Sequence, residues 1–307
     1  MSSLSDLLAP AACFMGAAGL DRLSATRAVI LGMPYDKGGS AIRVGARMGP
    51  EAIRAQSRHL DRFFPAFSSL DAVAALELAD AGDVAVTLGD HAASMAACEA
   101  AARHLLQGRR KLVALGGDGC ITLPVLRAVG GVHEDLAVIH FDAHTDAYPP
   151  PAPGVHTTAT TFTYAASGGA IAAARCWHLG MRGTVSVSDV RAYGEGLGFR
   201  IIDDAEMRQV GLVETVKSVC AEIGDRPVHI CWDMDFFDPS AAPGVCDPTW
   251  GGVTSAEGLA MLRALSSLNI VSADVNTVCP PHDTQNMTAH LAATVTVALL
   301  HLMAGRG

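Results

Sequence analysis

Short apolar runs recur along the chain, and stretches with helical spacing of apolar residues separate them. The runs lack the alternation of apolar and polar residues that is typical of half-exposed strands, which indicates strands buried on both faces. The expected strands are Arg27–Gly32, Leu76–Ala79, Lys111–Leu115, Leu136–Phe141, Cys176–Met181, Phe199–Ile202, Val228–Trp232 and Ile270–Val275. Alternating strands and helices predict an α/β fold with a mostly parallel sheet of about eight strands, flanked by helices.

The helical stretches fill the spaces between these strands. The clearest are Gly49–Phe64, Asp90–Leu106, Val213–Ile223, Ser255–Leu265 and Met287–Met303. No repeat, charge block or long linker divides the chain, so residues 1–307 are predicted to form a single domain. The last stretch is apolar but short for a membrane span and contains His290 and His301, which favours a packed terminal helix.

Composition narrows the class of protein. Half of the 307 residues are apolar and 17% are charged, which suits a large core and excludes a mostly disordered chain. The formal net charge is −9 and there is no basic run, which argues against nucleic-acid and membrane partners. The eight cysteines form no CxxC pair and the N-terminus lacks a basic secretory start, so a cytoplasmic location is expected.

Acidic residues and a histidine follow two of the expected strands. Asp142, His144 and Asp146 follow one strand, and Asp233 and Asp235 follow another. Residues two apart on an extended chain point the same way, and the carboxyl ends of parallel strands meet at one edge. Four carboxylates and one imidazole suit a divalent metal such as Mn or Ni. Loop capping by these acids is the weaker alternative, because buried acids rarely gather without a cation.

Longer motifs surround these residues. They are the segment from Gly32 to Pro50, His140–Asp146, Leu179–Gly183, Trp232–Pro239, Ala242–Gly244, Gly251–Thr254 and Glu257. Together they resemble the ureohydrolases, the family of arginase, agmatinase and guanidinobutyrase. The resemblance implies an arginase-like three-layer fold and assembly into a trimer or hexamer.

The resemblance also implies a role for each of the acidic residues. Family members bind two metal ions bridged by a hydroxide that attacks the guanidinium carbon. By position, Asp142 and Asp233 would bridge both ions, His144 and Asp235 would complete one ion, and Asp146 would bind the other.

Three residues are expected to act in catalysis if the resemblance holds. Asp146 would carry a proton to the departing amine, and His156 matches the histidine that shuttles protons in the family. Glu257 matches a carboxylate that holds the planar guanidinium group.

The chain departs from the family pattern near the expected site. Gly119 replaces a histidine that binds the first metal, and the adjacent Cys120 is the nearest substitute. Thr277 stands where an acid is usual, and residues 245–247 replace a Thr-Gly-Thr sequence. We therefore expect one metal ion in place of two, or none, and altered loops on the substrate side.

Three functions follow from these observations. The first is a ureohydrolase-type amidine hydrolase that cleaves a C–N bond of agmatine, guanidinobutyrate, guanidine or a substituted biguanide. Arginine is disfavoured as a substrate, because residues 146–156 lack the pattern with which arginases hold an α-amino acid. The second is a weak or silent subunit of a mixed trimer or hexamer in which a paralogue carries the active site, as Gly119 would allow. The third, a deacetylase of related fold, is least supported because the segment from Ala242 to Glu257 resembles ureohydrolases.

Overall fold

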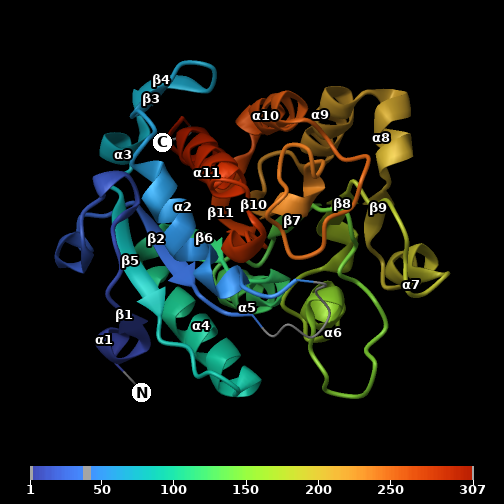
Figure 1. The fold of residues 1–307 in the computed structure, drawn as a ribbon, viewed down its shortest axis with the longest axis horizontal. Helices are drawn as coiled ribbons and strands as arrows, with labels where there is room; N and C mark the ends of the chain where they lie inside the picture. The colour runs from blue at the N-terminus through green and yellow to red at the C-terminus, as the bar shows by residue number, and fades with distance from the viewer. Residues whose placement is uncertain (1–2, 37–42, 306–307) are drawn as a thin grey trace.

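Nine strands form one continuous sheet in the computed structural model, which describes residues 3–36 and 43–305 (Figure 1). The strand order is β1-β5-β2-β6-β11-β10-β7-β8-β9, and every neighbouring pair is parallel except β1 with β5. The strands are β1 (Leu8–Ala9), β2 (Ala28–Met33), β5 (Ala79–Val84), β6 (Lys111–Gly116), β7 (Ala137–Phe141), β8 (Cys176–Leu179), β9 (Arg200–Ile202), β10 (Pro227–Asp233) and β11 (Asn269–Asn276). The predicted α/β class and mostly parallel sheet are confirmed, with the short antiparallel β1 added at one edge.

Helices cover both faces of the sheet (Figure 1). They are α1 (Leu4–Leu7), α2 (Gly49–Ser57), α3 (Ala72–Ala75), α4 (His91–Leu105), α5 (Thr122–Gly130), α6 (Thr161–Ser167), α7 (Val190–Gly196), α8 (Asp204–Val210), α9 (Leu212–Ile223), α10 (Ser255–Ala264) and α11 (Met287–Ala304). In β6, Val113 and Leu115 pack into the core that contains α2, α9, α10 and α11, whereas Leu112 and Ala114 pack into the core that contains α4, α5 and α6. Both faces of the strand are thus buried, which explains its uninterrupted apolar run.

Helix α11 is long and apolar enough to cross a membrane by composition alone, but 78% of it is buried inside the protein. It packs against α2, α10 and β11. The prediction of a packed terminal helix is confirmed.

The strand expected at Leu76–Ala79 lies instead at Ala79–Val84, a segment that contains two aspartates and a glycine. The reason is a buried ion pair. Arg54 of α2 is fully buried, and its Nε and Nη2 atoms each lie 2.9 Å from a carboxylate oxygen of Asp80. Its Nη1 lies 2.5 Å from Oδ1 of Asp83, so the acids of β5 have a cation beside them.

Helix α2 ends at Ser57, although a helix as far as Phe64 was expected. The Ser57 hydroxyl donates to the carbonyl of Arg54 and accepts from the amide of Met15, which favours the end of the helix. The chain continues into a small hairpin of β3 (Phe63–Phe64) and β4 (Ser68–Asp71).

Candidate metal centre and its cavity

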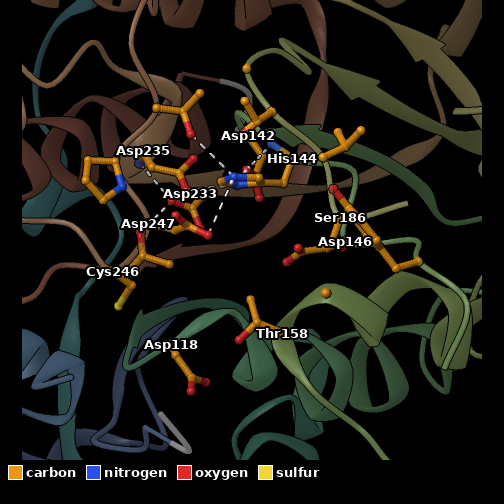
Figure 2. A pocket seen from close by; sticks show the side chains of 18 of the residues that line it. Asp118, Asp142, His144, Asp146, Thr158, Ser186, Asp233, Asp235, Cys246 and Asp247 are labelled. Atoms are coloured by element: carbon orange, nitrogen blue, oxygen red, sulfur yellow. Dashed lines mark hydrogen bonds and ion pairs between the residues drawn. The ribbon is translucent and has the colours of Figure 1, made fainter. Parts of the chain in front are cut away.

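A cavity of about 610 Å³ opens where the carboxyl ends of β6, β7, β10 and β11 meet. The structure brings Asp142, His144, Asp146, Asp233 and Asp235 to this one cavity, as the spacing of these residues predicted (Figure 2). The other lining residues are Asp118, Tyr148, Thr158, Ala159, Gly183, Thr184, Val185, Ser186, Cys246, Asp247, Pro248, Thr249, Trp250 and Thr277. No Lys or Arg from the described ranges, 3–36 and 43–305, lines it, so the cavity favours cations.

Three of these side chains form a compact cluster. The Nδ1 atom of His144 lies 3.1 Å from Oδ1 of Asp142 and 3.2 Å from Oδ2 of Asp235. Their ligand atoms all lie within 4.8 Å of one another, which is close enough to hold one metal ion.

Matching turns at the ends of β7 and β10 present these groups. Oδ1 of Asp142 accepts a hydrogen bond from the amide of His144, and Oδ1 of Asp233 accepts one from the amide of Asp235. In each turn an aspartate bonds to the backbone two residues on, which bends the chain at the strand end. The local sequence therefore fixes where the ligand atoms lie.

Asp146 also lines the cavity, near Asp142, and is 5% exposed. Its φ of +47° is in the left-handed region, where a residue other than glycine is held only by its surroundings. Thr277, which also lines the cavity, has a φ of +66° and donates from Oγ1 to Oδ1 of Asp233 over 2.5 Å. Two residues of the cavity wall, Asp146 and Thr277, thus have their backbone in the left-handed region.

His140 was missed by the sequence analysis. It lies in β7, and its Nε2 is 2.9 Å from Oδ2 of Asp142, while its Nδ1 is 2.9 Å from Nδ1 of His178. A second possible ligand cluster contains His140, Asp142 and Asp146. The signal was present, because His140 lies two residues before Asp142 and so points to the same side of an extended chain.

Burial and neighbouring charges shift the pKa values of the acids in the cavity. Burial and the nearby Asp142 raise the pKa of Asp146 well above its ordinary value. Burial, followed by the charges of Asp235 and Asp142, does the same to the pKa of Asp233, and burial with Asp142 raises the pKa of Asp235 to about 6. Burial opposes ionisation of Asp142 too, but His140 and His144 hold the pKa of that carboxyl well below its usual range.

This donor set fits a divalent metal. Oxygen ligands dominate it, the acids are buried, and a bound cation would favour the ionised form that burial and the neighbouring acids oppose.

Gly119 borders the Asp146 side of the cavity. A Cβ atom added to it would lie 3.1 Å from Oδ2 of Asp146 and 2.6 Å from Cγ2 of Thr158. Cys120 does not take the place of the missing ligand, because its buried thiol lies 3.6 Å from Oγ1 of Thr158 and is not among the lining residues. This side of the site therefore lacks the ligand that the family pattern has at position 119.

His156 is buried just behind the cavity and does not line it. Its Nε2 lies 3.2 Å from Oγ1 of Thr161, and its Nδ1 lies 3.0 Å from Nε2 of His91. The other ring nitrogen of His91 lies 2.8 Å from the hydroxyl of Tyr35. These contacts form a continuous chain of proton-exchanging groups, and the predicted shuttle role of His156 remains a prediction.

Glu257 is not among the residues that line the cavity, and its expected contact with a guanidinium stays a prediction. Its carboxylate accepts from the amide and the hydroxyl of Thr254, at 2.7 and 2.8 Å, and lies 3.7 Å from Arg208. A capping box at the start of α10 holds this half-exposed glutamate at the third helical position.

Arg182 fixes the loop that closes one side of the cavity. Its guanidinium donates to the backbone carbonyls of Asp235, at 2.6 Å, and Thr249, at 2.9 Å. Oγ1 of Thr249 in turn lies 3.4 Å from Nε2 of His144. One half-buried cation therefore joins the end of β10 to the loop that contains residues 245–250.

Comparison with known proteins agrees with this geometry. Residues 26–301 match the model of the Arginase family. An agmatinase of Neisseria meningitidis serogroup C is 37% identical over 281 residues, covering 91% of this chain and 87% of that protein. The proclavaminate amidinohydrolase of Streptomyces clavuligerus is 34% identical over 278 residues, covering 89% and 87%.

Solved structures show the same fold. A hypothetical agmatinase from Burkholderia thailandensis superposes with a TM-score of 0.87 at 32% identity, over 97% of this chain and 91% of that one. The proclavaminate amidinohydrolase structure gives 0.87 at 30% identity over the whole of both chains. The family match, the relatives and the fold agree, and the chain belongs to the arginase family.

Proposed function

We propose that the protein is a metal-dependent hydrolase that cleaves a C–N bond of a guanidino-type compound. The observation that carries this proposal is the convergence of Asp142, His144, Asp146, Asp233 and Asp235 on one cavity. Relatives that are named agmatinase and proclavaminate amidinohydrolase support the substrate class.

Asp142, His144, Asp233 and Asp235 would hold a divalent ion, Mn or Ni. When bound, such an ion lowers the pKa of a water and stabilises developing negative charge. Asp146 faces the same cavity with a raised pKa that follows from burial and from the charge of Asp142. A carboxyl group that binds a proton this readily is suited to deliver it to a departing amine.

The experiment combines metal analysis with product release. The purified protein is assayed for urea or amine release from agmatine, guanidinobutyrate, guanidine and substituted biguanides, with and without added Mn or Ni. Metal-dependent release from at least one compound supports the proposal. Absence of release at full metal occupancy, with or without any co-encoded paralogue, contradicts it.

A second candidate function has its own support. Gly119 offers no ligand beside Asp146, and the wall residue Thr277 has a hydroxyl in place of a carboxylate. A chain of this kind would serve as the weak or silent subunit of a mixed oligomer whose paralogue performs the hydrolysis. Co-purification with such a paralogue, together with activity that appears only in the complex, would favour it.

The assembly that we propose is a homo- or hetero-oligomer of three or six subunits in the cytoplasm, because the family resemblance implies closed assemblies. Light scattering at micromolar protein concentration tests this assembly. A stable monomer would contradict it.

A further inference from the structure

Asp247 is a carboxylate of the cavity that the metal cluster does not use. The other lining acids, Asp118, Asp142, Asp146, Asp233 and Asp235, follow β6, β7 and β10 at the base of the cavity. Asp247 belongs to the loop between β10 and α10 and faces them from the side, as Figure 2 shows. Among the residues that the structure describes, it belongs to no ligand cluster, and the cap of α10 is formed by Thr254 and Glu257.

The contacts of Asp247 leave it available to a ligand. Its one ion pair with a described residue is with Nε2 of His144 at 3.8 Å, which is too long for a hydrogen bond. The same nitrogen lies closer to Oγ1 of Thr249, at 3.4 Å. The side chain of Asp247 is 36% exposed, so its oxygens are open to the cavity.

The loop holds this carboxylate in a defined place. The amide of Cys246 donates to the carbonyl of Thr277 over 3.2 Å, and Arg182 donates to the carbonyl of Thr249. Asp247 lies between these two anchored residues. An acid whose backbone is fixed on both sides can select a ligand by shape as well as by charge.

The surroundings favour a planar organic cation. Thr277, whose carbonyl accepts the amide of Cys246, has an uncharged side chain, and its hydroxyl already donates to Asp233. Trp250 is 75% exposed at the mouth of the cavity, and Tyr148 lines the wall, so aromatic faces are present for a cation to pack on. Asp118 and Asp247 are the lining acids outside the proposed metal set, and Oδ1 of Asp118 already accepts the amide of Cys120. Asp247 is therefore the better placed of the two to pair with a substrate cation.

We propose that Asp247 is a specificity-determining residue that binds the amidinium or guanidinium head of the substrate through two parallel N–H···O bonds. The proposal rests on the proposed function for the identity of the substrate class. It does not require that this chain completes the reaction, because binding alone reveals it.

The test compares Asp247→Asn with Asp189→Asn, which makes the same charge change at an exposed residue that does not line the cavity. Binding of guanidinium chloride and of agmatine to the metal-loaded protein is measured by calorimetry, and metal content is measured alongside. Asp247→Asn is expected to weaken both ligands by about 10- to 100-fold, while Asp189→Asn leaves them unchanged. Where the wild type releases urea, KM should rise by a similar factor.

Three results would overturn the proposal. They are equal affinity in Asp247→Asn and wild type, loss of metal in Asp247→Asn, and no binding of either guanidinium compound to the wild type. A wild type that binds guanidinium through Asp247, but at full metal occupancy releases neither urea nor amine with or without a paralogue, refutes the proposed hydrolase activity and leaves this inference standing. Urea release with an unchanged KM in Asp247→Asn refutes the role of Asp247 in binding and leaves the proposed hydrolase activity standing.

Discussion

A Cβ atom built on Gly119 would lie 3.1 Å from Oδ2 of Asp146. A side chain at position 119 would therefore project toward the Asp146 side of the cavity, where the family pattern has a histidine. The same atom would lie 2.6 Å from Cγ2 of Thr158, so this methyl group occupies the space that the histidine would need.

Restoring the histidine should raise metal content. We expect the wild type to bind at most one tightly held ion per chain, and Gly119→His combined with Thr158→Ser to bind up to one more. Thr158→Ser removes the obstructing methyl, and the imidazole adds a ligand beside Asp146. Metal analysis after dialysis measures the difference.

Thr158→Ser alone is the control, and it should leave metal content unchanged. Two fully occupied ions in the wild type would contradict the prediction. Equal metal content in the double variant and the wild type would also contradict it.

Some of the site was predictable because its geometry is local. Asp142, His144 and Asp146 are spaced two apart directly after a buried run, and this alone places them at the edge of a parallel sheet. The capping contact of Glu257 was not predicted, although Thr254 and Glu257 have the spacing of a capping box. A motif match gives the position of an acid in the sequence and not the direction of its side chain.

Long-range pairing explains most of the remaining differences. Strand β5 contains Asp80 and Asp83, and the cation that pairs with both is Arg54, more than 25 residues away in sequence. The role of Asp247 is hidden for the same reason, since it depends on Arg182 and Thr277 fixing the loop. These contacts join segments whose proximity no local pattern reveals.

Arg54 should be essential for stability. Arg54→Met would leave the buried carboxylate of Asp80 without its partner, which costs about 3–5 kcal/mol in the free energy of unfolding. Urea unfolding followed by circular dichroism measures this loss. The exposed pair of Lys217 and Glu214 is the comparison, and Lys217→Met should change stability by less than about 1 kcal/mol.

The double variant Arg54→Met with Asp80→Leu tests the cause. It should be more stable than Arg54→Met alone, because no buried charge is left without a partner. A double variant that is no more stable than the single one would show that packing around Arg54, and not its charge, holds β5 against α2.

Metal should stabilise the protein more at neutral than at acidic pH. Burial, followed by the charge of Asp142, raises the pKa of Asp235 from 3.8 to about 6 in the metal-free protein. The folded state therefore binds a proton that the unfolded state has lost between these two pH values, and folding stability falls as pH rises through this window. A bound cation stabilises the ionised carboxylate and reverses this loss.

The increase in Tm on adding Mn or Ni should be larger at about pH 7.5 than at about pH 5. Differential scanning calorimetry at the two pH values measures it. Asp235→Asn should reduce the increase at both, whereas Asp61→Asn, at an exposed position, should not. An increase in Tm that is the same at both pH values in the wild type would be the contrary result.

Asp235→Ala separates an enzyme from a silent partner. In an active chain this substitution should reduce turnover to background, because Asp235 and Asp142 flank the imidazole of His144 in the compact ligand cluster and the remaining groups hold metal poorly. In a silent subunit the activity of the mixed oligomer should remain nearly unchanged, since the reaction would take place in the paralogue. Thermal unfolding must first show that the variant is folded, because removing a buried acid from among others changes stability by itself. Full activity in a folded Asp235→Ala complex would therefore refute the catalytic role of this chain and leave the partner role.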